Sequence, residues 1–215
     1  MAKEPLVGSI KTRLSPPLSP EEAAEFYEAM LLDTINMASS VMNVDLAIAV
    51  TPPESTGYFK HLAPRDTILI PVECADIGGC LAAVLGKLFS MSYHHVLTIN
   101  SDGPSTPSVY IERAVQSLEK HDLVLGPADD GGYYLVGLNQ VHAEIFTGID
   151  WSTNQVLNQT LTKATQTGLT IDLLPAWYDV DTAADIDRLR QELETLPPGS
   201  LKFTRKFFKR WPGIM

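Results

Sequence analysis

Short apolar runs alternate with amphipathic segments along almost the whole chain. The runs are mostly apolar, and they lie at 44–50, 67–72, 95–100, 122–127, 133–138 and 170–175. A run without polar alternation is typical of a strand that is buried on both faces of its sheet. Between most of these runs, apolar residues recur at helical spacing. The pattern therefore predicts an α/β fold with a mostly parallel central sheet covered by helices on both faces.

Two helix starts are marked by capping signals. Ser19-Pro20-Glu21-Glu22 combines a capping box with proline in the first turn, which predicts a long helix from this point to about Val41. Thr182 and Asp185 form a second box, ahead of a final amphipathic helix. Further helices are expected within 81–91, 108–121 and 152–168, and the segment 51–54, TPPE, is expected to be a turn that leaves the first strand.

Length, charge and cysteine count limit the class of protein. The 215 residues fit one domain, and the net charge of -10 argues against a general nucleic-acid surface. Cys74 and Cys80 are the only cysteines, and their spacing matches neither a zinc pair nor a redox pair. We therefore expect two buried free thiols in a reducing compartment. No run approaches 18 apolar residues, so a cytoplasmic protein without membrane contact is expected.

The C-terminal segment differs from the rest of the chain in charge. A main domain over 1–196 is followed by a basic aromatic tail over 197–215, which holds five cations and no acid. Phe203, Phe207 and Trp211 recur at helical spacing in this tail. Such a helix could lie on an anionic membrane. Packing against the acidic domain is the explanation that we favour.

Carboxylates follow three of the expected strands. Asp102 comes after the strand at 95–100, the pair Asp129 and Asp130 after that at 122–127, and Asp179 and Asp181 after that at 170–175. Ligands in sheets of this kind bind beyond the carboxyl ends of the strands. Aspartate is also common in turns and helix caps, which would account for any one of these acids alone. Their recurrence at three exits instead favours convergence on one site.

The candidate chemistry is the binding of phosphate with a divalent cation. Hard carboxylate oxygens suit Mg²⁺ or Mn²⁺, and Lys11 and Arg13 would neutralise the charge on a diphosphate. Neither the dinucleotide-binding glycine motif nor the P-loop motif occurs.

Five stretches together resemble a known family. They are AKEPLVGSIKTRLSPPLS, SDGPSTP, GPADDGGYYLVGL, GIDWSTNQVLNQTL and WYDVDTAADIDRL, and they span nearly the whole chain. The chain resembles bacterial glycosyltransferase-like proteins of the nucleotide-diphospho-sugar transferase (GT-A) superfamily, some of which are arsenosugar-biosynthesis glycosyltransferases. The resemblance implies a three-layer Rossmann-like fold and an enzyme.

The resemblance also implies a role for each candidate residue. Lys11 and Arg13 would bind the diphosphate, with Gly78 and Gly79 as weaker nucleotide contacts. Asp102 would hold the metal, and Asp179 or Asp181 would add a second metal contact. The implied catalytic and substrate-binding residues are Asp130 and Asp129, then Gly131, Gly132, Trp151 and Ser152.

The chain departs from the family pattern at two places. Relatives have an apolar strand before the phosphate loop, whereas Met1 here falls almost at the loop. We hypothesise that the true start lies upstream, and a shortened, inactive protein is the alternative. In addition, Asn100-Ser101 stands where relatives more often have glycine ahead of the acid, which bears on the metal geometry.

Three functions are compatible with these features of the sequence. The leading one is a metal-dependent transferase that moves a sugar from a nucleotide-sugar to a small acceptor. The alternatives are a nucleotidyltransferase that joins an NTP to a phosphorylated small molecule, and a non-catalytic nucleotide-binding protein. The sequence leaves open the base, the sugar, the acceptor, the stereochemical outcome and the oligomeric state.

Overall fold

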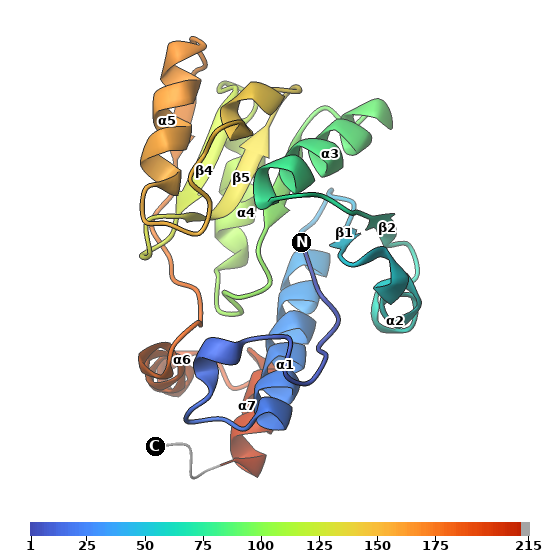
Figure 1. Ribbon diagram of the computed structural model, residues 1–215, viewed down its shortest axis with the longest axis vertical. Coiled ribbons are helices and arrows are strands. Elements are labelled where there is room, and N and C mark those ends of the chain that lie inside the picture. The colour runs from blue at the N-terminus through green and yellow to red at the C-terminus, as the bar shows by residue number, and fades with distance from the viewer. Residues whose placement is uncertain (212–215) are drawn as a thin grey trace.

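Six strands and seven helices make up the part of the chain that the computed structural model describes, residues 1–211 (Figure 1). The strands are β1 (Ala47–Val50), β2 (Ile68–Pro71), β3 (Val96–Ile99), β4 (Leu123–Pro127), β5 (Tyr133–Leu138) and β6 (Ile171–Leu173). The helices are α1 (Pro20–Ser39), α2 (Thr56–Leu62), α3 (Ile77–Ser90), α4 (Ser108–Ser117), α5 (Val156–Gln166), α6 (Ala183–Thr195) and α7 (Lys202–Arg210). Every strand expected from the apolar runs is present, and the α/β fold class is confirmed.

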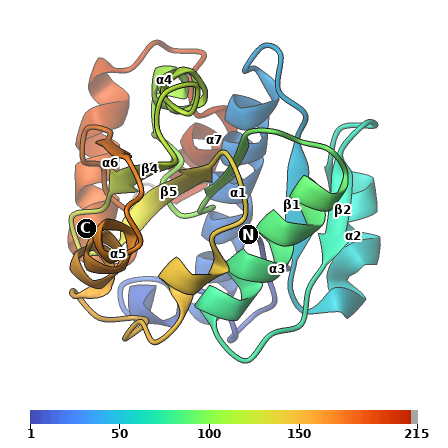
Figure 2. The same ribbon diagram turned by 90° about the horizontal axis from the view of Figure 1, so that it is seen from above.

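The strands β3, β5, β4 and β6 form one four-stranded sheet in that order. Only β5 runs against the other three, because a tight turn joins it directly to β4. Successive residues of β4 point to opposite faces, so Leu123 and Leu125 pack toward α3 and α5, whereas Val124 packs toward α4. Helices thus cover both faces of this sheet, as the view from above shows (Figure 2).

The strands β1 and β2 form a separate parallel pair. The start of the chain links this pair to the larger sheet. Ala2 bridges Val50 of β1, and the Met1 ammonium donates to the Ile99 carbonyl of β3 at 3.0 Å. Within residues 1–211 no strand separates β1 from β3, and a cavity of about 400 Å³ lies there, lined by residues such as Ala47 and Thr98.

Both predicted capping boxes are present. Ser19 caps α1 and Thr182 caps α6, each in reciprocal contact with the acid three residues on. The segment after β1 is more ordered than the expected turn, because a 3₁₀ turn at Pro53–Ser55 leads into α2. The helix α5 starts at Val156 and not at Ser152, whose backbone is left-handed with φ 64° and cannot continue into a helix.

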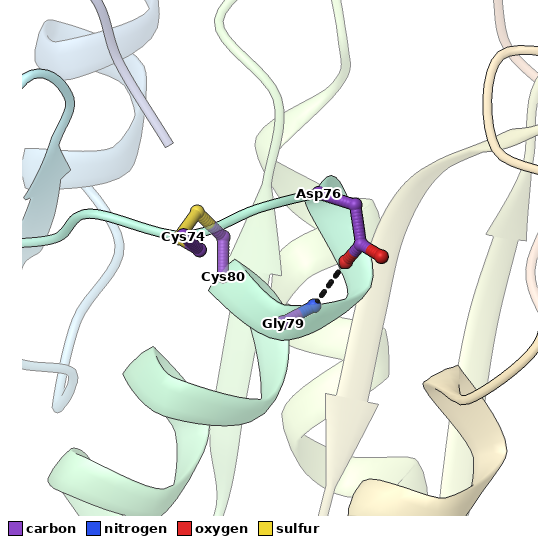
Figure 3. Close-up of a disulfide and its surroundings, with 4 residues drawn as sticks. All are labelled: Cys74, Asp76, Gly79 and Cys80. Atoms are coloured by element: carbon purple, nitrogen blue, oxygen red, sulfur yellow. Dashed lines mark hydrogen bonds between the residues drawn. A yellow bond between two sulfur atoms is a disulfide. The ribbon is translucent and has the colours of Figure 1, made fainter.

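The expectation of two free thiols is wrong. Cys74 and Cys80 form a disulfide, with their Cα atoms 5.4 Å apart (Figure 3). Asp76 caps α3 by accepting a hydrogen bond from the Gly79 amide at 2.7 Å, and this cap turns the chain back on itself. The first helical turn therefore brings Cys80 against Cys74. Since the expected reducing compartment rested on free thiols, the cytoplasmic location stays only a prediction.

The basic aromatic tail packs on the domain through α7. Phe207 is 5% exposed, and its ring centroid lies 4.9 Å from that of Phe26 in α1. The buried carboxylate of Asp33, also in α1, accepts hydrogen bonds from the Phe203 and Thr204 amides at the start of α7. Packing of the tail is confirmed as far as Trp211, and residues 212–215 of the tail lie outside the described part. Among the described helices none is long and apolar enough to cross a membrane.

Candidate functional site

A cleft of about 880 Å³ lies where the carboxyl ends of the strands meet the N-terminal loop. Polar side chains from three strand exits and the N-terminal loop form one end, and apolar side chains from α3 and the segment before α5 form the other. Nine of the thirteen candidate residues from the sequence line it: Lys11, Arg13, Asp102, Asp130, Gly132, Trp151, Ser152, Asp179 and Asp181. The other four lie outside the lining: Gly131, which lies in the β4–β5 turn, and Gly78, Gly79 and Asp129.

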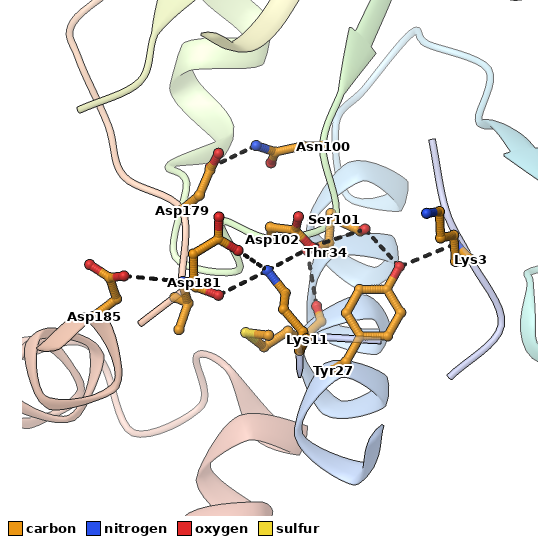
Figure 4. Close-up of polar contacts among 12 residues, drawn as sticks. Lys3, Lys11, Tyr27, Thr34, Asn100, Ser101, Asp102, Asp179, Asp181 and Asp185 are labelled. Carbon is orange, nitrogen blue, oxygen red and sulfur yellow. Dashed lines mark hydrogen bonds and ion pairs between the residues drawn. The ribbon is translucent and has the colours of Figure 1, made fainter. Parts of the chain in front are cut away.

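Lys11 is the centre of the charged end (Figure 4). Its Nζ lies 2.7 Å from Asp181 Oδ1 and 3.2 Å from Asp102 Oδ1, and it also donates to the Val180 carbonyl at 2.9 Å. Arg13 binds the other oxygen of Asp181 at 2.5 Å. Burial by itself would lower the pKa of Lys11, but Asp102 and Asp181 outweigh it, so the pKa is raised and the side chain stays charged.

Asp179 lies beside this cluster in a drier environment. Its Oδ1 accepts a hydrogen bond from Asn100 Nδ2 at 2.6 Å. Burial raises the pKa of Asp179 to about 7, and the negative charges of Asp102, Asp130 and Asp181 add to the shift, while the Asn100 hydrogen bond opposes it. Near neutral pH this carboxyl is therefore close to half protonated, unlike a solvated aspartate.

The sequence patterns did not predict a chain of hydrogen bonds that lies next to Asp102. Tyr27 of α1 shares a hydrogen bond of 2.9 Å with Ser101 Oγ, and its oxygen accepts from the Lys3 amide at 3.2 Å. Burial raises the pKa of Tyr27, and the charge of Asp102 adds to this. The position of Ser101 next to Asp102 was a usable signal. Tyr27 had none, because in the sequence it is only one more apolar position of a helix.

The Asp-Asp-Gly-Gly turn separates its two acids. Asp130 lines the cleft, and its Oδ1 accepts a hydrogen bond from the Gly132 amide at 2.8 Å. Asp129 instead pairs with Arg188 of α6 at 2.6 Å, at an exposed position. Gly131 has φ 88°, and a Cβ there would lie 2.4 Å from the Asn154 carbonyl oxygen. The glycine thus lets the turn close against the segment before α5, which carries Trp151 and Ser152. The catalytic roles of Asp130 and Asp129 stay predictions.

The apolar end of the cleft is built around Trp151. Its ring lies edge-on to Tyr133 with centroids 6.4 Å apart, and Ile77 and Leu81 of α3 line the same end. Gly78 is buried against this indole, since a Cβ there would lie 2.7 Å from Trp151 Nε1. The Gly79 amide is already bound by Asp76. The structure thus gives Gly78 a packing role, and nucleotide contact by Gly78 and Gly79 stays a prediction.

The donor set at the charged end suits a divalent cation only in part. Asp102 and Asp181 are hard oxygen ligands of the kind that Mg²⁺ and Mn²⁺ prefer. Both point at one position, but the ammonium of Lys11 fills it. Within residues 1–211 no group of three His, Cys, Asp or Glu side chains is arranged to hold a metal ion. The chemistry fits a cation, whereas the arrangement is that of an ion-pair cluster.

Comparison with known proteins places the chain in a family. Residues 34–153 match the bacterial family DUF2064, which is described as an uncharacterized protein conserved in bacteria. The chain belongs to this family. It is also 24% identical over 182 residues to the 2-phospho-L-lactate guanylyltransferase of Methanothermobacter thermautotrophicus, which covers 83% of this chain and 78% of that protein.

Solved structures support membership of the nucleotide-diphospho-sugar transferase-like superfamily. A candidate nucleotide-diphospho-sugar transferase from Desulfovibrio desulfuricans G20 matches with a TM-score of 0.88 and 26% identity, over 98% of this chain and 95% of that one. The 4-diphosphocytidyl-2C-methyl-D-erythritol synthase of Anaerococcus prevotii shares the fold at a TM-score of 0.58 and 11% identity, over 77% and 89% of the two chains. The nucleotide-diphospho-sugar transferase-like fold is thus confirmed, and the narrower glycosyltransferase assignment is not.

Proposed function

We propose that the protein is a nucleotidyltransferase, which moves a nucleoside monophosphate from an NTP to a phosphorylated small molecule. The observation that carries this is the cleft, in which Lys11, Arg13 and four aspartates at one end face an apolar, aromatic end. That division suits a ligand with a polyphosphate and a less polar part. The guanylyltransferase relative, which is similar over 83% of the chain, favours nucleotidyl transfer over sugar transfer.

The reaction balances without a further reactant. An oxygen of the acceptor phosphate attacks the α-phosphorus of the NTP and forms a new P–O bond. The bond from the α-phosphorus to the oxygen bridging to the β-phosphorus breaks, and diphosphate leaves with the electron pair. The acceptor phosphate is already ionised at neutral pH, so no strong base is required for the attack.

The residues at the charged end would act by electrostatics and positioning. Lys11 and Arg13 would bind the departing diphosphate, whose charge rises as the bond breaks. A divalent cation, if bound by Asp102 and Asp181, would neutralise phosphate oxygens. Asp130 would orient the acceptor from the β4–β5 turn, and Trp151 would shield the apolar part of a substrate from water. The cleft volume of about 880 Å³ is sufficient for a nucleotide with a small acceptor.

Sugar transfer is the second candidate. It is favoured by the similarity to the Desulfovibrio protein, which extends over nearly the whole of both chains. The same cations would then bind the diphosphate of a nucleotide-sugar, and a nucleoside diphosphate would leave. The two candidates differ in the bond that breaks, and so in the product that is released.

The released product therefore provides the test. The protein would first be screened by thermal unfolding against NTPs and nucleotide-sugars, each with and without Mn²⁺. A ligand that binds only the folded state adds about 2.7 kcal/mol at a hundredfold excess over its Kd. NTPs that stabilise the protein would then be incubated with phosphorylated hydroxy acids and sugar phosphates. We expect diphosphate release that requires both substrates.

A pair of lysine variants adds a test of the site and its matched control. Lys11→Met should abolish diphosphate release, whereas Lys60→Met removes an exposed lysine of α2 outside the cleft lining and should leave the rate unchanged. Release of a nucleoside diphosphate from a nucleotide-sugar, with no diphosphate from any NTP, would replace this proposal by sugar transfer. Absence of any stabilising nucleotide would overturn both and favour a non-catalytic protein.

A further inference from the structure

The disulfide between Cys74 and Cys80 is a poor device for stabilising the whole domain. It joins residues only six positions apart, and the chain has no other cysteine. A cross-link over so short a loop restricts the unfolded chain much less than one over a long loop. A chain of 215 residues is also long enough to bury a full core without such a bridge. The local surroundings of the disulfide therefore indicate its role.

The disulfide fastens an exposed segment to the start of α3. The segment comprises residues 73–76, between β2 and α3, and all of it except Cys74 is exposed. Within residues 1–211, the backbone groups of 73–75 form no hydrogen bond with other backbone groups. Asp76 is held through its cap on the Gly79 amide, which lies within the helix itself. The disulfide is thus the side-chain link that holds the middle of this segment against α3.

The turn of α3 that carries Cys80 also forms the apolar end of the cleft. Ile77 and Leu81 line that end. Gly78 lies so close to Trp151 that an added Cβ would be 2.7 Å from the indole Nε1. Any movement of this helical turn therefore changes the surroundings of Trp151 and the shape of the cleft.

The two sulfur atoms differ in accessibility. Cys80 is buried, with 8% of its surface exposed, whereas Cys74 is partly exposed and lies on the exposed segment (Figure 3). A thiolate from solution would therefore attack Sγ of Cys74. Exposed disulfides of this kind are the ones that thiol exchange reaches readily.

We propose that Cys74 and Cys80 form a redox-active site, which a dithiol reductant opens and which controls the apolar end of the cleft. One thiolate of the dithiol forms a mixed disulfide with Cys74 as the Cys74–Cys80 bond breaks. Cys80 leaves with the electron pair and takes up a proton. The second thiolate of the dithiol then attacks its own sulfur in the mixed disulfide and releases Cys74. The protein gains two electrons and two protons, and the dithiol becomes a disulfide.

Reduction would release the segment from α3. The cap at Asp76 then holds the first helical turn without the link to Cys74, so this turn loosens and moves relative to Trp151. Oxidation would restore the contact. This inference goes beyond the proposed function, since it concerns the shape of the cleft and requires neither a nucleotide nor turnover.

The test compares the unmodified chain in reduced and in oxidised dithiothreitol, without denaturant. The three tryptophans are replaced by 5-fluorotryptophan, and the ¹⁹F resonance of Trp151 is assigned as the one that Trp151→Phe removes. We expect reduced dithiothreitol to release two thiols and to shift the Trp151 resonance. The resonances of Trp177 and Trp211 should stay in place, and oxidised dithiothreitol should reverse the change.

Hydrogen exchange gives a second measurement on the same samples. The amides of Gly79 and Cys80, which are bound to Asp76, should exchange faster by about tenfold or more after reduction, because a helix end without its tether opens more readily. Amides in the middle of α1 should be unaffected.

A double variant provides the control. Cys74→Ser combined with Cys80→Ser should give the spectrum of the reduced chain, and dithiothreitol should not change it. The main comparison uses the unmodified chain, so it does not depend on the folding of this variant.

Three results would overturn the inference. One is the release of no thiol from the folded chain by dithiothreitol. Another is the release of two thiols while the Trp151 resonance and the exchange of both amides stay unchanged. The third is the persistence of two free thiols in oxidised dithiothreitol. Diphosphate release would remain possible in each case, so the proposed function is tested separately.

Discussion

Gly78 in the first turn of α3 is a position where a single added methyl group should disturb the apolar end of the cleft. A Cβ at Gly78 would lie 2.6 Å from the Phe146 carbonyl oxygen and 2.7 Å and 2.9 Å from atoms of the Trp151 indole. Since one of these neighbours is backbone, the strain cannot be relieved by a side-chain rotation alone. Overpacking of this kind costs about 1–3 kcal/mol.

The helix itself opposes this loss only in part. Alanine is favoured over glycine by about 1 kcal/mol in a helix interior, and by less in a first turn. We therefore expect Gly78→Ala to lower the free energy of unfolding by about 1–2 kcal/mol. For a chain of this size that corresponds to a fall in Tm of roughly 2–8 °C. Trp151 should also shift, which tryptophan fluorescence would detect.

The same helix contains two matched controls. At Gly79 the nearest atom to an added Cβ is Asp76 Oδ1 at 3.4 Å, and at Gly86 nothing lies within 4 Å. Gly86→Ala should raise the free energy of unfolding by about 0.4–1 kcal/mol, and Gly79→Ala should be close to neutral. The assay is thermal and urea unfolding of the three variants together.

The outcome separates packing from ligand binding. If Gly78→Ala were as stable as Gly86→Ala, the close contact with Trp151 would be refuted. If Gly78→Ala kept its stability but lost nucleotide affinity, the main chain at Gly78 would be a ligand contact, as the resemblance implied, and the packing role would be wrong.

Two further perturbations test other parts of the molecule. Because the pKa of Asp179 is raised from 3.8 to about 7, the folded state keeps a proton that the unfolded state loses over this pH range. The free energy of unfolding should therefore fall as pH rises from about 4 to 7, by at most about 4 kcal/mol. Asp179→Asn should remove this pH dependence of the free energy of unfolding. The urea midpoints of the variant and the unmodified chain would be compared at pH 4.5 and pH 7.5. An equal difference at the two pH values would contradict the raised pKa of Asp179. Phe207→Ala should lower the free energy of unfolding by about 3–5 kcal/mol, because Phe207 is 5% exposed against Phe26, whereas Lys206→Ala at the exposed face of α7 should change it by less than about 0.5 kcal/mol. A urea-unfolding loss below about 1 kcal/mol for Phe207→Ala would show that the tail adds little to the domain.

Interactions between residues close in the sequence were sufficient to predict most of the helices and strands. A strand that is buried on both faces is mostly apolar, so the central strands β4 and β5 were visible as apolar runs. Capping also acts within four residues, which is why the starts of α1 and α6 were predicted correctly from Ser19 and Thr182. The grouping of acids at strand ends followed from the same logic, since parallel strands end at one edge of a sheet. Asp102, Asp179 and Asp181 indeed line one cleft.

The partners of individual side chains depend on contacts that are distant in the sequence, and these were decided by the tertiary structure. Two adjacent aspartates diverge, because the β4–β5 turn sends Asp130 to the cleft and Asp129 to Arg188, 59 residues away. Cys74 and Cys80 pair only because the cap at Asp76 turns the first helical turn back.

The same holds for the charged cluster. The sequence by itself determined which residues supply the charges, because composition and strand order are local properties. Only the fold decided that Lys11 lies between Asp102 and Asp181 and not free in the cleft, since this contact joins positions up to 170 residues apart. A buried charge takes the partner that the packed chain places within reach, and no local pattern encodes that choice.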